Sequence, residues 1–532
     1  MNRLVNLLSG IVFALIPLSG QPGDLYRITG MVTNAATGSP IGGTRVNILP
    51  MGSTQVVASQ ITDGNGRFSF ELIQGNYHLE AMNRDLVEPY GLRGPDSRVA
   101  TSIITGPGKD TTNLVFRWFP LGVISGKIVD EAGEPAERIL VQLVRSVITA
   151  GRRSWVTAGW AWTDDRGEYR FGAIPGGTYL LAATGTPWYA RAQPGPFVDR
   201  SIAPPVAYSP VYYPSTTNIS QAAPLRLAAG KEVRADFNLS VVRGANVIVK
   251  HDAPAGLTGR IALISEGGLG GVDGFQRQEN FNGSHTPFVF TAIPPGRYMV
   301  RITGSEGVTD FAATRTVEVS GSDVSVELEV HRVPTVSGKV KLGNPDGKPR
   351  GSLLVGLVRE DTGGAISTAV KPDGTFLFPS VAVAKYRPAI RGTTGYFATQ
   401  IQVEGTHYND GVMDLREGES VTMTLVASDE TGRLRGFVMQ DEKPISGAMV
   451  VLAPILAGSD TLKYRGFQTD SDGSFDLQNV VAGDYDLFAV DFDIEYGNPA
   501  AVRPFLSNAR RVHIEPHGDA SERIGISSEA QQ

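Results

Sequence analysis

Thr163-Asp164-Asp165-Arg166-Gly167-Glu168-Tyr169-Arg170-Phe171 is the stretch of sequence that decides the fold we predict. Its first five residues are typical of a turn, because an Asp side chain accepts hydrogen bonds from its own backbone and Gly tolerates a positive φ. Tyr169 and Phe171 then alternate with two charged residues, which is the pattern of a half-buried strand. A second turn at Pro175-Gly176-Gly177 leads into Tyr179, so the stretch predicts two strands joined by a turn.

The same pattern recurs along the chain. Close copies begin at Thr62 and Thr469, a weaker copy begins at Lys371, and Phe288-Val289-Phe290 with Tyr298 keeps only the second half. An opening strand that contains a glycine precedes each copy, and these glycines are Gly30, Gly126, Gly244, Gly338 and Gly436. A period of roughly a hundred residues is typical of β-sandwich domains. The repeat therefore predicts five related units.

The motifs resemble those of the carboxypeptidase regulatory-like domain family. The residues that carry the resemblance are Ile124-Ser125-Gly126-Lys127-Ile128-Val129, the stretch from Thr163 to Phe171, and the second turn with Tyr179. The resemblance implies a transthyretin-like sandwich, grouped with starch-binding-like (carbohydrate-binding-like) folds and similar to the B-type repeats of bacterial adhesins. The zinc peptidase domain that accompanies this family needs metal-ligating His and Glu that the chain lacks, so no peptidase activity carries over. A weaker similarity to the N-terminal region of TonB-dependent receptors is set aside, because no barrel strands follow.

We therefore expect an all-β fold, a tandem array of five transthyretin/Ig-like antiparallel β-sandwich domains after an N-terminal signal peptide. The expected boundaries are 1–20 for the signal peptide and 24–119, 120–242, 243–332, 333–428 and 429–527 for the sandwiches. The second sandwich has a Pro- and aromatic-rich insert at 187–224, and the third is degenerate.

The first residues and the overall composition predict export. Arg3 precedes the apolar stretch from Leu4 to Leu18, and Ser19-Gly20 offer small residues before a cleavage ahead of Gln21. We expect a periplasmic, outer-surface or extracellular protein with no membrane span in the mature chain. The net charge of −6, with 48 basic and 54 acidic residues and no dense basic block, argues against nucleic acid as a partner.

The sequence contains no recognisable catalytic motif. It lacks Gly-x-Ser-x-Gly and His-Glu-x-x-His, and it has no Cys. The Gly-rich loop at 267–274 fails the dinucleotide-binding pattern because Asp273 replaces the third glycine. His513, Glu515 and His517 would share one face of a strand and could hold a metal, but Pro516 interrupts the strand, so a solvated face with Val512 and Ile514 inward is favoured. We predict no enzyme activity, no metal site and no cofactor.

Aromatic residues of the second unit are the one feature that points to a ligand. Trp160 and Trp162 are two residues apart, so they share a face. Facing solvent they would form a platform for stacking on sugar rings, whereas facing inward they would fill the core, and we favour the core for both. Partial exposure is expected for Trp188. The candidate ligand-binding residues are Trp160, Trp162, Trp188, Tyr189, Tyr212 and Tyr213.

Two functions follow from these observations. The first is a non-enzymatic exported scaffold or adhesion protein at the cell surface or in the periplasm. The alternative is a carbohydrate-binding protein that uses the aromatic residues of the second unit. The expected partners are accordingly a polysaccharide or another surface protein.

Overall fold

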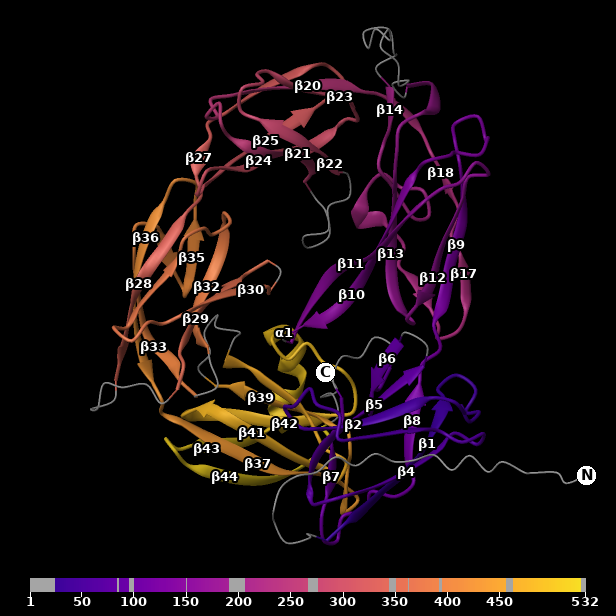
Figure 1. The fold of residues 1–532 in the computed structure, drawn as a ribbon, viewed down its shortest axis with the longest axis vertical. Coiled ribbons are helices and arrows are strands. Elements are labelled where there is room, and N and C mark those ends of the chain that lie inside the picture. Colours follow the sequence, from indigo (N-terminus) through magenta and orange to yellow (C-terminus); the bar gives the residue numbers. More distant parts are fainter. Residues whose placement is uncertain are drawn as a thin grey trace, which may run out of the picture.

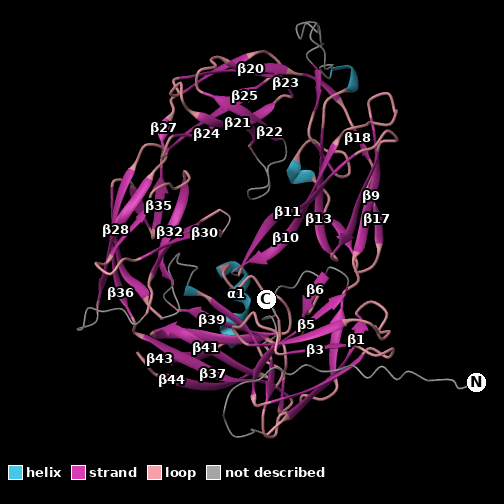
Figure 2. Cartoon of the chain, viewed as in Figure 1, coloured by secondary structure: helices cyan, strands magenta, loops and turns pink. Residues whose placement is uncertain are grey.

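The computed structural model describes residues 24–83, 86–94, 100–149, 151–190, 206–266, 276–343, 351–361, 363–391, 395–455 and 463–527. The predicted signal peptide at 1–20 and the Gly-rich loop at 267–274 lie outside these ranges. Strands dominate the described residues (Figure 2), and their one α-helix is α1 (Pro499–Val502). The all-β prediction is confirmed. No helix in the described ranges is long and apolar enough to cross a membrane.

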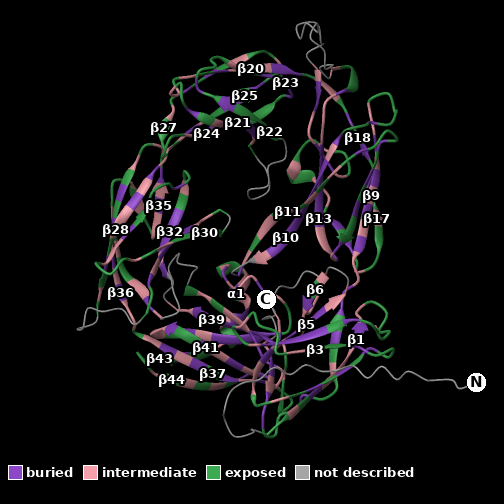
Figure 3. Cartoon of the chain, in the orientation of Figure 1, coloured by how far each residue is buried: buried purple, intermediate pink, exposed green. Residues whose placement is uncertain are grey.

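The strands form five pairs of sheets that follow one another around a closed ring, so that the fifth pair lies beside the first (Figure 1). Five separate core clusters fall within residues 28–118, 124–239, 245–328, 336–427 and 434–524. We call these the first to fifth units. Figure 3 shows buried and exposed positions alternating along their strands, as expected for sheets with one face on a core.

The first and second units have the following strands. In the first unit, one sheet has the order β4 (Arg67–Leu72), β1 (Tyr26–Asn34), β8 (Leu114–Trp118), and the other β3 (Ala58–Ile61), β2 (Arg45–Pro50), β5 (Gly75–Asn83), β6 (Leu86–Pro89), with β7 (Ile103–Thr105) also on β5. In the second unit, one sheet has β12 (Glu168–Ile174), β9 (Gly122–Val129), β17 (Glu232–Arg234) and, also on β9, β18 (Phe237–Asn238). The other has β11 (Arg152–Trp162), β10 (Leu140–Thr149), β13 (Gly177–Thr184), β15 (Val211–Tyr212) and, also on β13, β16 (Leu225–Leu227). β14 (Val206–Tyr208) pairs with β19 (Val241–Arg243).

The remaining units repeat this plan. In the third unit, one sheet has the strand order β23 (Phe288–Ile293), β20 (Ala245–His251), β26 (Val324–Leu328). The other sheet has the order β22 (Gln276–Asn282), β21 (Thr258–Ser265), β24 (Gly296–Glu306), β25 (Thr309–Val319), β27 (His331–Arg332). In the fourth unit, one sheet has the strand order β31 (Thr375–Phe378), β28 (Thr335–Leu342), β36 (Ser420–Ser428), β33 (Phe397–Glu404). The other sheet has the order β30 (Ala365–Ala369), β29 (Leu354–Arg359), β32 (Ala384–Arg391), β35 (Val412–Leu415), β34 (His407–Asn409). In the fifth unit, one sheet has the strand order β38 (Lys443–Pro444), β37 (Thr431–Gln440), β41 (Ser474–Val481), and β44 (Asp519–Gly525) also pairs with β37. The other sheet has the order β40 (Arg465–Gln468), β39 (Met449–Pro454), β42 (Gly483–Val490), β43 (Arg510–Ile514).

Most strand pairs are antiparallel, but in each unit the opening strand pairs in parallel with a closing strand, and in the second unit β9 also pairs in parallel with β18. These pairs are β1 with β8, β9 with β17, β20 with β26, β28 with β36, and β37 with β44. The two ends of each unit are therefore held side by side in one sheet.

The turn glycines adopt the predicted conformation. Gly66, Gly167 and Gly473 have φ of 73°, 71° and 76°. The carboxylate of Asp164 accepts hydrogen bonds from the backbone N–H groups of Arg166 at 3.0 Å and Glu168 at 2.8 Å. This is the self-capping turn that the sequence indicated.

The opening-strand glycine makes room for an aromatic ring on the neighbouring strand. Gly30 lies opposite Phe68, Gly126 opposite Tyr169, Gly338 opposite Phe376 and Gly436 opposite Phe475, pairs that come from four different units. In the third unit the corresponding aromatic, Phe288, lies opposite Val249. Gly244 lies just before β20, and Val249 takes the place opposite the aromatic ring. The prediction that Gly244 is equivalent to the other four glycines is therefore wrong.

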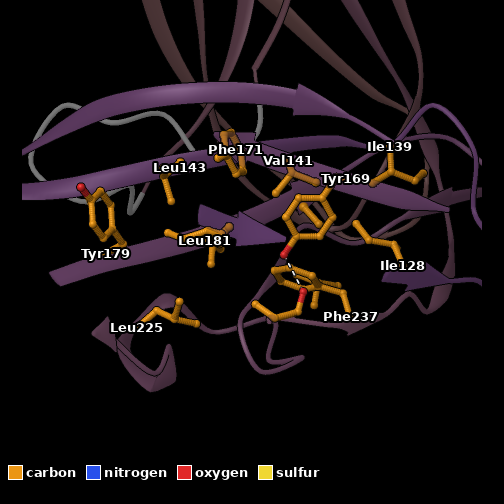
Figure 4. Packing of buried hydrophobic residues seen from close by; sticks show 14 of the residues in the cluster. Ile128, Ile139, Val141, Leu143, Tyr169, Phe171, Tyr179, Leu181, Leu225 and Phe237 are labelled. Atoms are coloured by element: carbon orange, nitrogen blue, oxygen red, sulfur yellow. Dashed lines mark hydrogen bonds between the residues drawn. The ribbon is translucent and has the colours of Figure 1, made fainter. Parts of the chain in front are cut away.

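The core of the second unit shows the role of the two alternating aromatic residues, Tyr169 and Phe171. Tyr169 and Phe171 point into the sandwich (Figure 4), where their rings meet edge to face with centroids 5.9 Å apart. The hydroxyl of Tyr169 donates a hydrogen bond of 2.5 Å to the carbonyl oxygen of Ala235. Because Tyr169 is 3% exposed, this bond satisfies a polar group that burial would otherwise leave unpaired.

A second tyrosine is used identically in all five units. Tyr77, Tyr179, Tyr298, Tyr386 and Tyr485 are buried, and each donates its hydroxyl hydrogen to the carbonyl oxygen four residues upstream. The bond ties the start of the returning strand to the preceding turn, as a tyrosine corner does in other sandwiches.

Tyr179→Phe tests this corner. The change removes the 2.5 Å hydrogen bond to Pro175 while keeping the ring, so we expect the free energy of unfolding of the second unit to fall by about 1–2 kcal/mol. Urea unfolding followed by tryptophan emission measures the change. Tyr189→Phe, which removes an exposed hydroxyl from the same unit, is the control, and equal midpoints for the two variants would refute the role of the corner.

Candidate functional site

Trp160 and Trp162 lie on β11, the edge strand of its sheet, and both face solvent. Their exposed fractions are 64% and 63%, so the expectation that they fill the core is wrong. The reason lies in Ala161, which packs against the core of the second unit. Since neighbouring residues on a strand point to opposite faces, both indoles are turned outward.

The residues beside these two indoles are known from the strand register. Trp160 pairs with Gln142 on β10, which in turn pairs with Ala182 on β13. Trp162 pairs with Leu140, followed by Thr184. Gln142 is buried, and its amide nitrogen donates to Thr157 Oγ1 at 3.2 Å.

Trp188 and Tyr189 are two further exposed aromatic residues of the second unit, and they follow the end of β13. They lie in the short helix η1 (Trp188–Ala190), which begins four residues after Thr184. Trp188, for which partial exposure was predicted, is 70% exposed, and its ring meets that of Tyr189 edge to face with centroids 5.5 Å apart. The Tyr189 hydroxyl donates to the carboxylate of Glu131 at 2.7 Å, and this hydrogen bond raises the pKa of Tyr189 to about 12. Glu131 thereby fixes the ring against which Trp188 rests.

The other two candidate residues do not belong to this surface. Tyr212 is 8% exposed on β15, and Tyr213 packs against the core beside Phe237, with ring centroids 6.0 Å apart. In its described part, the insert at 187–224 is therefore a strap packed on its own unit, and these tyrosines anchor it. We define the aromatic surface as Trp160, Trp162, Trp188 and Tyr189.

The His513 segment is a solvated sheet face. Val512 and Ile514 are buried, as predicted. His513 lies 2.7 Å from the carboxylate of Asp484, whose hydrogen bond raises the pKa of the imidazole. His517 is in the following turn, with φ of 57°. Within the described ranges, no group of three or more His, Asp or Glu residues could hold a metal ion.

A polar hollow of about 330 Å³, which no sequence motif predicted, lies where the second, fourth and fifth units meet. The β10–β11 hairpin reaches the fifth unit there, where the Arg153 guanidinium lies 2.7 Å from the carboxylate of Glu495. On the opposite wall Glu360 is 3.0 Å from the guanidinium of Arg387. The first ion pair joins the second unit to the fifth, and the second lies within the fourth unit, so these four charges are paired without a ligand.

One segment of the chain is similar to a known protein family. Residues 27–88 match the family model of the carboxypeptidase regulatory-like domain. Over these residues the chain is similar to a carboxypeptidase regulatory-like domain. This finding confirms the resemblance, and the match ends at β6, so it covers most of the first unit. No curated protein matches the chain in sequence.

Several solved structures are similar to parts of the chain at low identity. The Bacillus anthracis TIE protein is 11% identical over 77% of this chain and 75% of its own, with a TM-score of 0.18. A streptococcal ancillary pilin is 12% identical over 52% of this chain and 98% of its own, with a TM-score of 0.18. GBS52, a minor pilin of Streptococcus agalactiae, is 16% identical over 41% and 96%, with a TM-score of 0.23. Sequence identities and TM-scores this low do not place the chain in the same family as any of these three proteins.

Proposed function

We propose that this chain is a non-enzymatic, exported scaffold of five sandwich domains that binds polysaccharide through the aromatic surface of its second domain. The observation that carries the proposal is the exposure of Trp160 and Trp162 on a sheet edge. The domains correspond to 24–119, 120–242, 243–332, 333–428 and 429–527. The scaffold acts at the cell surface or in the periplasm, where another surface protein is the second partner we consider.

The geometry of the aromatic surface suits a sugar chain. Two residues along a strand span about 7 Å, so two indoles on one face present a row of flat apolar surfaces. Exposed tryptophans cost hydration free energy and are rarely grouped on a surface without a use. Ala161, which is half-buried against the core between Trp160 and Trp162, and the hydrogen bond from Tyr189 to Glu131 hold parts of this surface in place before any ligand arrives. Such preorganisation lowers the cost of binding.

The scaffold role rests on the arrangement of the units. Each described unit has its own core, and ion pairs such as Arg153 with Glu495 connect units that are far apart in sequence. A ring that is tied together in this way positions the second unit relative to the others and needs no chemistry of its own.

Tryptophan emission tests sugar binding. Four of the five tryptophans lie in the second unit, whereas Trp118 belongs to the core of the first, so we use a Trp118→Phe background. We expect titration with a panel of polysaccharides to produce a saturable shift or quench for one of them. Trp160→Ala with Trp162→Ala should weaken that binding at least about tenfold, because each indole loses roughly 1 kcal/mol of apolar contact.

Stability distinguishes this outcome from a structural role. Exposed indoles leave no cavity when removed, so the double variant should unfold within about 1 kcal/mol of the parent. A loss of about 3 kcal/mol or more per residue would mean that the indoles are buried in solution. Binding that survives in the double variant, or a panel without any response, would refute the polysaccharide proposal and leave the scaffold with a protein partner.

A further inference from the structure

The ring is closed by a polar contact between the first and fifth units (Figure 1). The amide nitrogen of Gln468 donates to Thr101 Oγ1 at 2.6 Å and to the carbonyl oxygen of Gly91 at 3.0 Å. The backbone N–H of Ser471 donates to the carbonyl oxygen of Ser102 at 2.8 Å, and Ser471 Oγ accepts from the N–H of Ile104 at 3.1 Å. We call these residues of the two units, with Arg93, Lys109 and the turn 469–473, the latch.

The turn in the latch is the same motif that decides the fold, but one aspartate is used differently. Asp63 and Asp164 accept hydrogen bonds from their own turns. The equivalent residue of the fifth unit, Asp470, is 5% exposed and its carboxyl group is hydrogen-bonded to the Ser102 hydroxyl of the first unit. Asp472 caps the turn instead, accepting from the N–H of Ser474 at 3.0 Å. The carboxyl group of Asp470 therefore contacts the first unit instead of capping its own turn.

The charged groups that act on Asp470 are two carboxylates, those of Asp472 and Asp476. Asp472 and Asp476 lie on its own side, and each is engaged elsewhere: Asp472 with Lys109 at 2.6 Å, and Asp476 with Arg433 at 2.6 Å. The first unit offers Asp470 the neutral Ser102, while its Lys109 is held by Asp472. Arg93 approaches Asp491 and Asp493. Burial, and then the two neighbouring carboxylates, raise the pKa of Asp470 to about 7.

The closed contact is also incompletely satisfied. Three buried side-chain polar atoms of this region lack a hydrogen-bond partner among the described residues: Arg93 Nη1, Gln468 Oε1 and Asp493 Oδ1. Arg93 does donate to the carbonyl oxygen of Gly447. Buried polar atoms without partners recover hydrogen bonds to water when two surfaces separate, so they favour opening. A polar contact of this kind is typical of domains that separate and rejoin.

We propose that the first and fifth units form a separable latch that closes the ring when Asp470 is protonated and opens as its carboxyl group ionises. The latch does not depend on polysaccharide binding. Its occupant is the first unit of the same chain, which the fifth unit recognises through the turn 469–473.

The direction of the pH effect follows from proton linkage. In the open ring Asp470 is in water, where an Asp has a pKa of about 3.9. The closed ring therefore binds one more proton between about pH 4 and pH 7. Its closing constant falls up to about tenfold for each pH unit as the pH rises through this range, and it levels off above the pKa of about 7 in the closed state.

Energy transfer between two dyes measures the closure. The chain has no Cys, so Val115→Cys in the first unit and Ser521→Cys in the fifth, both exposed, are labelled without background. We expect the transfer efficiency of the full chain to decrease from pH 5 to pH 8. Asp470→Asn keeps the shape and cannot ionise, so its efficiency should stay at the high value. An excess of unlabelled chain should change nothing, because the contact is within one chain.

Two matched variants make the result specific. Asp472→Asn loses the ion pair with Lys109 and also one of the two carboxylates that raise the pKa of Asp470, so it should lower the efficiency at every pH and move the remaining pH dependence to lower pH. Asp164→Asn alters the same motif position in the second unit, outside the latch, and should reproduce the parent. An efficiency independent of pH in the parent, or a pH dependence that persists in Asp470→Asn, overturns the proposal.

Discussion

Gly126→Ala should unfold the second unit at denaturant concentrations that leave the others folded. A Cβ atom at this position would lie 2.8 Å from Cε1 of the buried Tyr169 ring and still closer to the carbonyl oxygen of Ala235. The backbone carbonyl cannot move away without separating β9 from the strand beside it. We expect a loss of at least about 3 kcal/mol, a large part of the stability of a domain of this size.

Gly159→Ala is the control for this variant. A Cβ there meets only Phe171 at 3.6 Å, which is an ordinary contact, and Gly159 has no positive φ. Urea unfolding in the Trp118→Phe background reports on the second unit in both variants. Similar midpoints for Gly126→Ala and Gly159→Ala would show that the glycine opposite Tyr169 is not required by packing.

Gly167→Val should have the second largest effect, through two costs at once. Its φ of 71° strains any β-branched residue by about 1–3 kcal/mol. A Cβ would also lie 3.0 Å from the backbone nitrogen of Ala136 and still closer to the carbonyl oxygen of Ile128. We expect a total loss of about 3 kcal/mol or more in urea unfolding.

Gly133→Val separates the two costs. Gly133 belongs to the same unit and has φ of 81°, but a Cβ there meets nothing within 4 Å. It should therefore show the backbone strain alone and destabilise less than Gly167→Val. Equal losses would mean that the crowding at Gly167 carries no cost, and no loss in either variant would contradict the positive φ.

The parts of the fold that local chemistry fixes were predictable. The turn glycines, the alternation of Tyr169 with Phe171, and the tyrosine that follows each second turn depend on residues within about twenty positions of each other. The third unit shows the limit of this approach. Without the Thr-Asp turn, nothing in the sequence set the register, and Gly244 was aligned where the strand places Val249.

The candidate site was predictable in its residues and not in its orientation. The spacing of Trp160 and Trp162 required a shared face, but either face agreed with the sequence. The small residue between them, Ala161, decided the matter by packing inward. The latch could not be predicted either, because Asp470 and Asp164 stand in the same local motif and differ only in what lies opposite them in space.

The parallel pairing of the first and last strands has a mechanical consequence. In the first unit the chain enters along β1 and leaves along β8, which are adjacent and run in the same direction. A pull on the two ends of the unit therefore slides these strands past each other, and the hydrogen bonds between them resist together instead of opening one by one. The same holds for β28 and β36, whose pairing extends from Thr335 with Ser420 to Leu342 with Ala427. A chain of such units under tension should give way first at the contacts between units, and the sandwiches should break only at higher force.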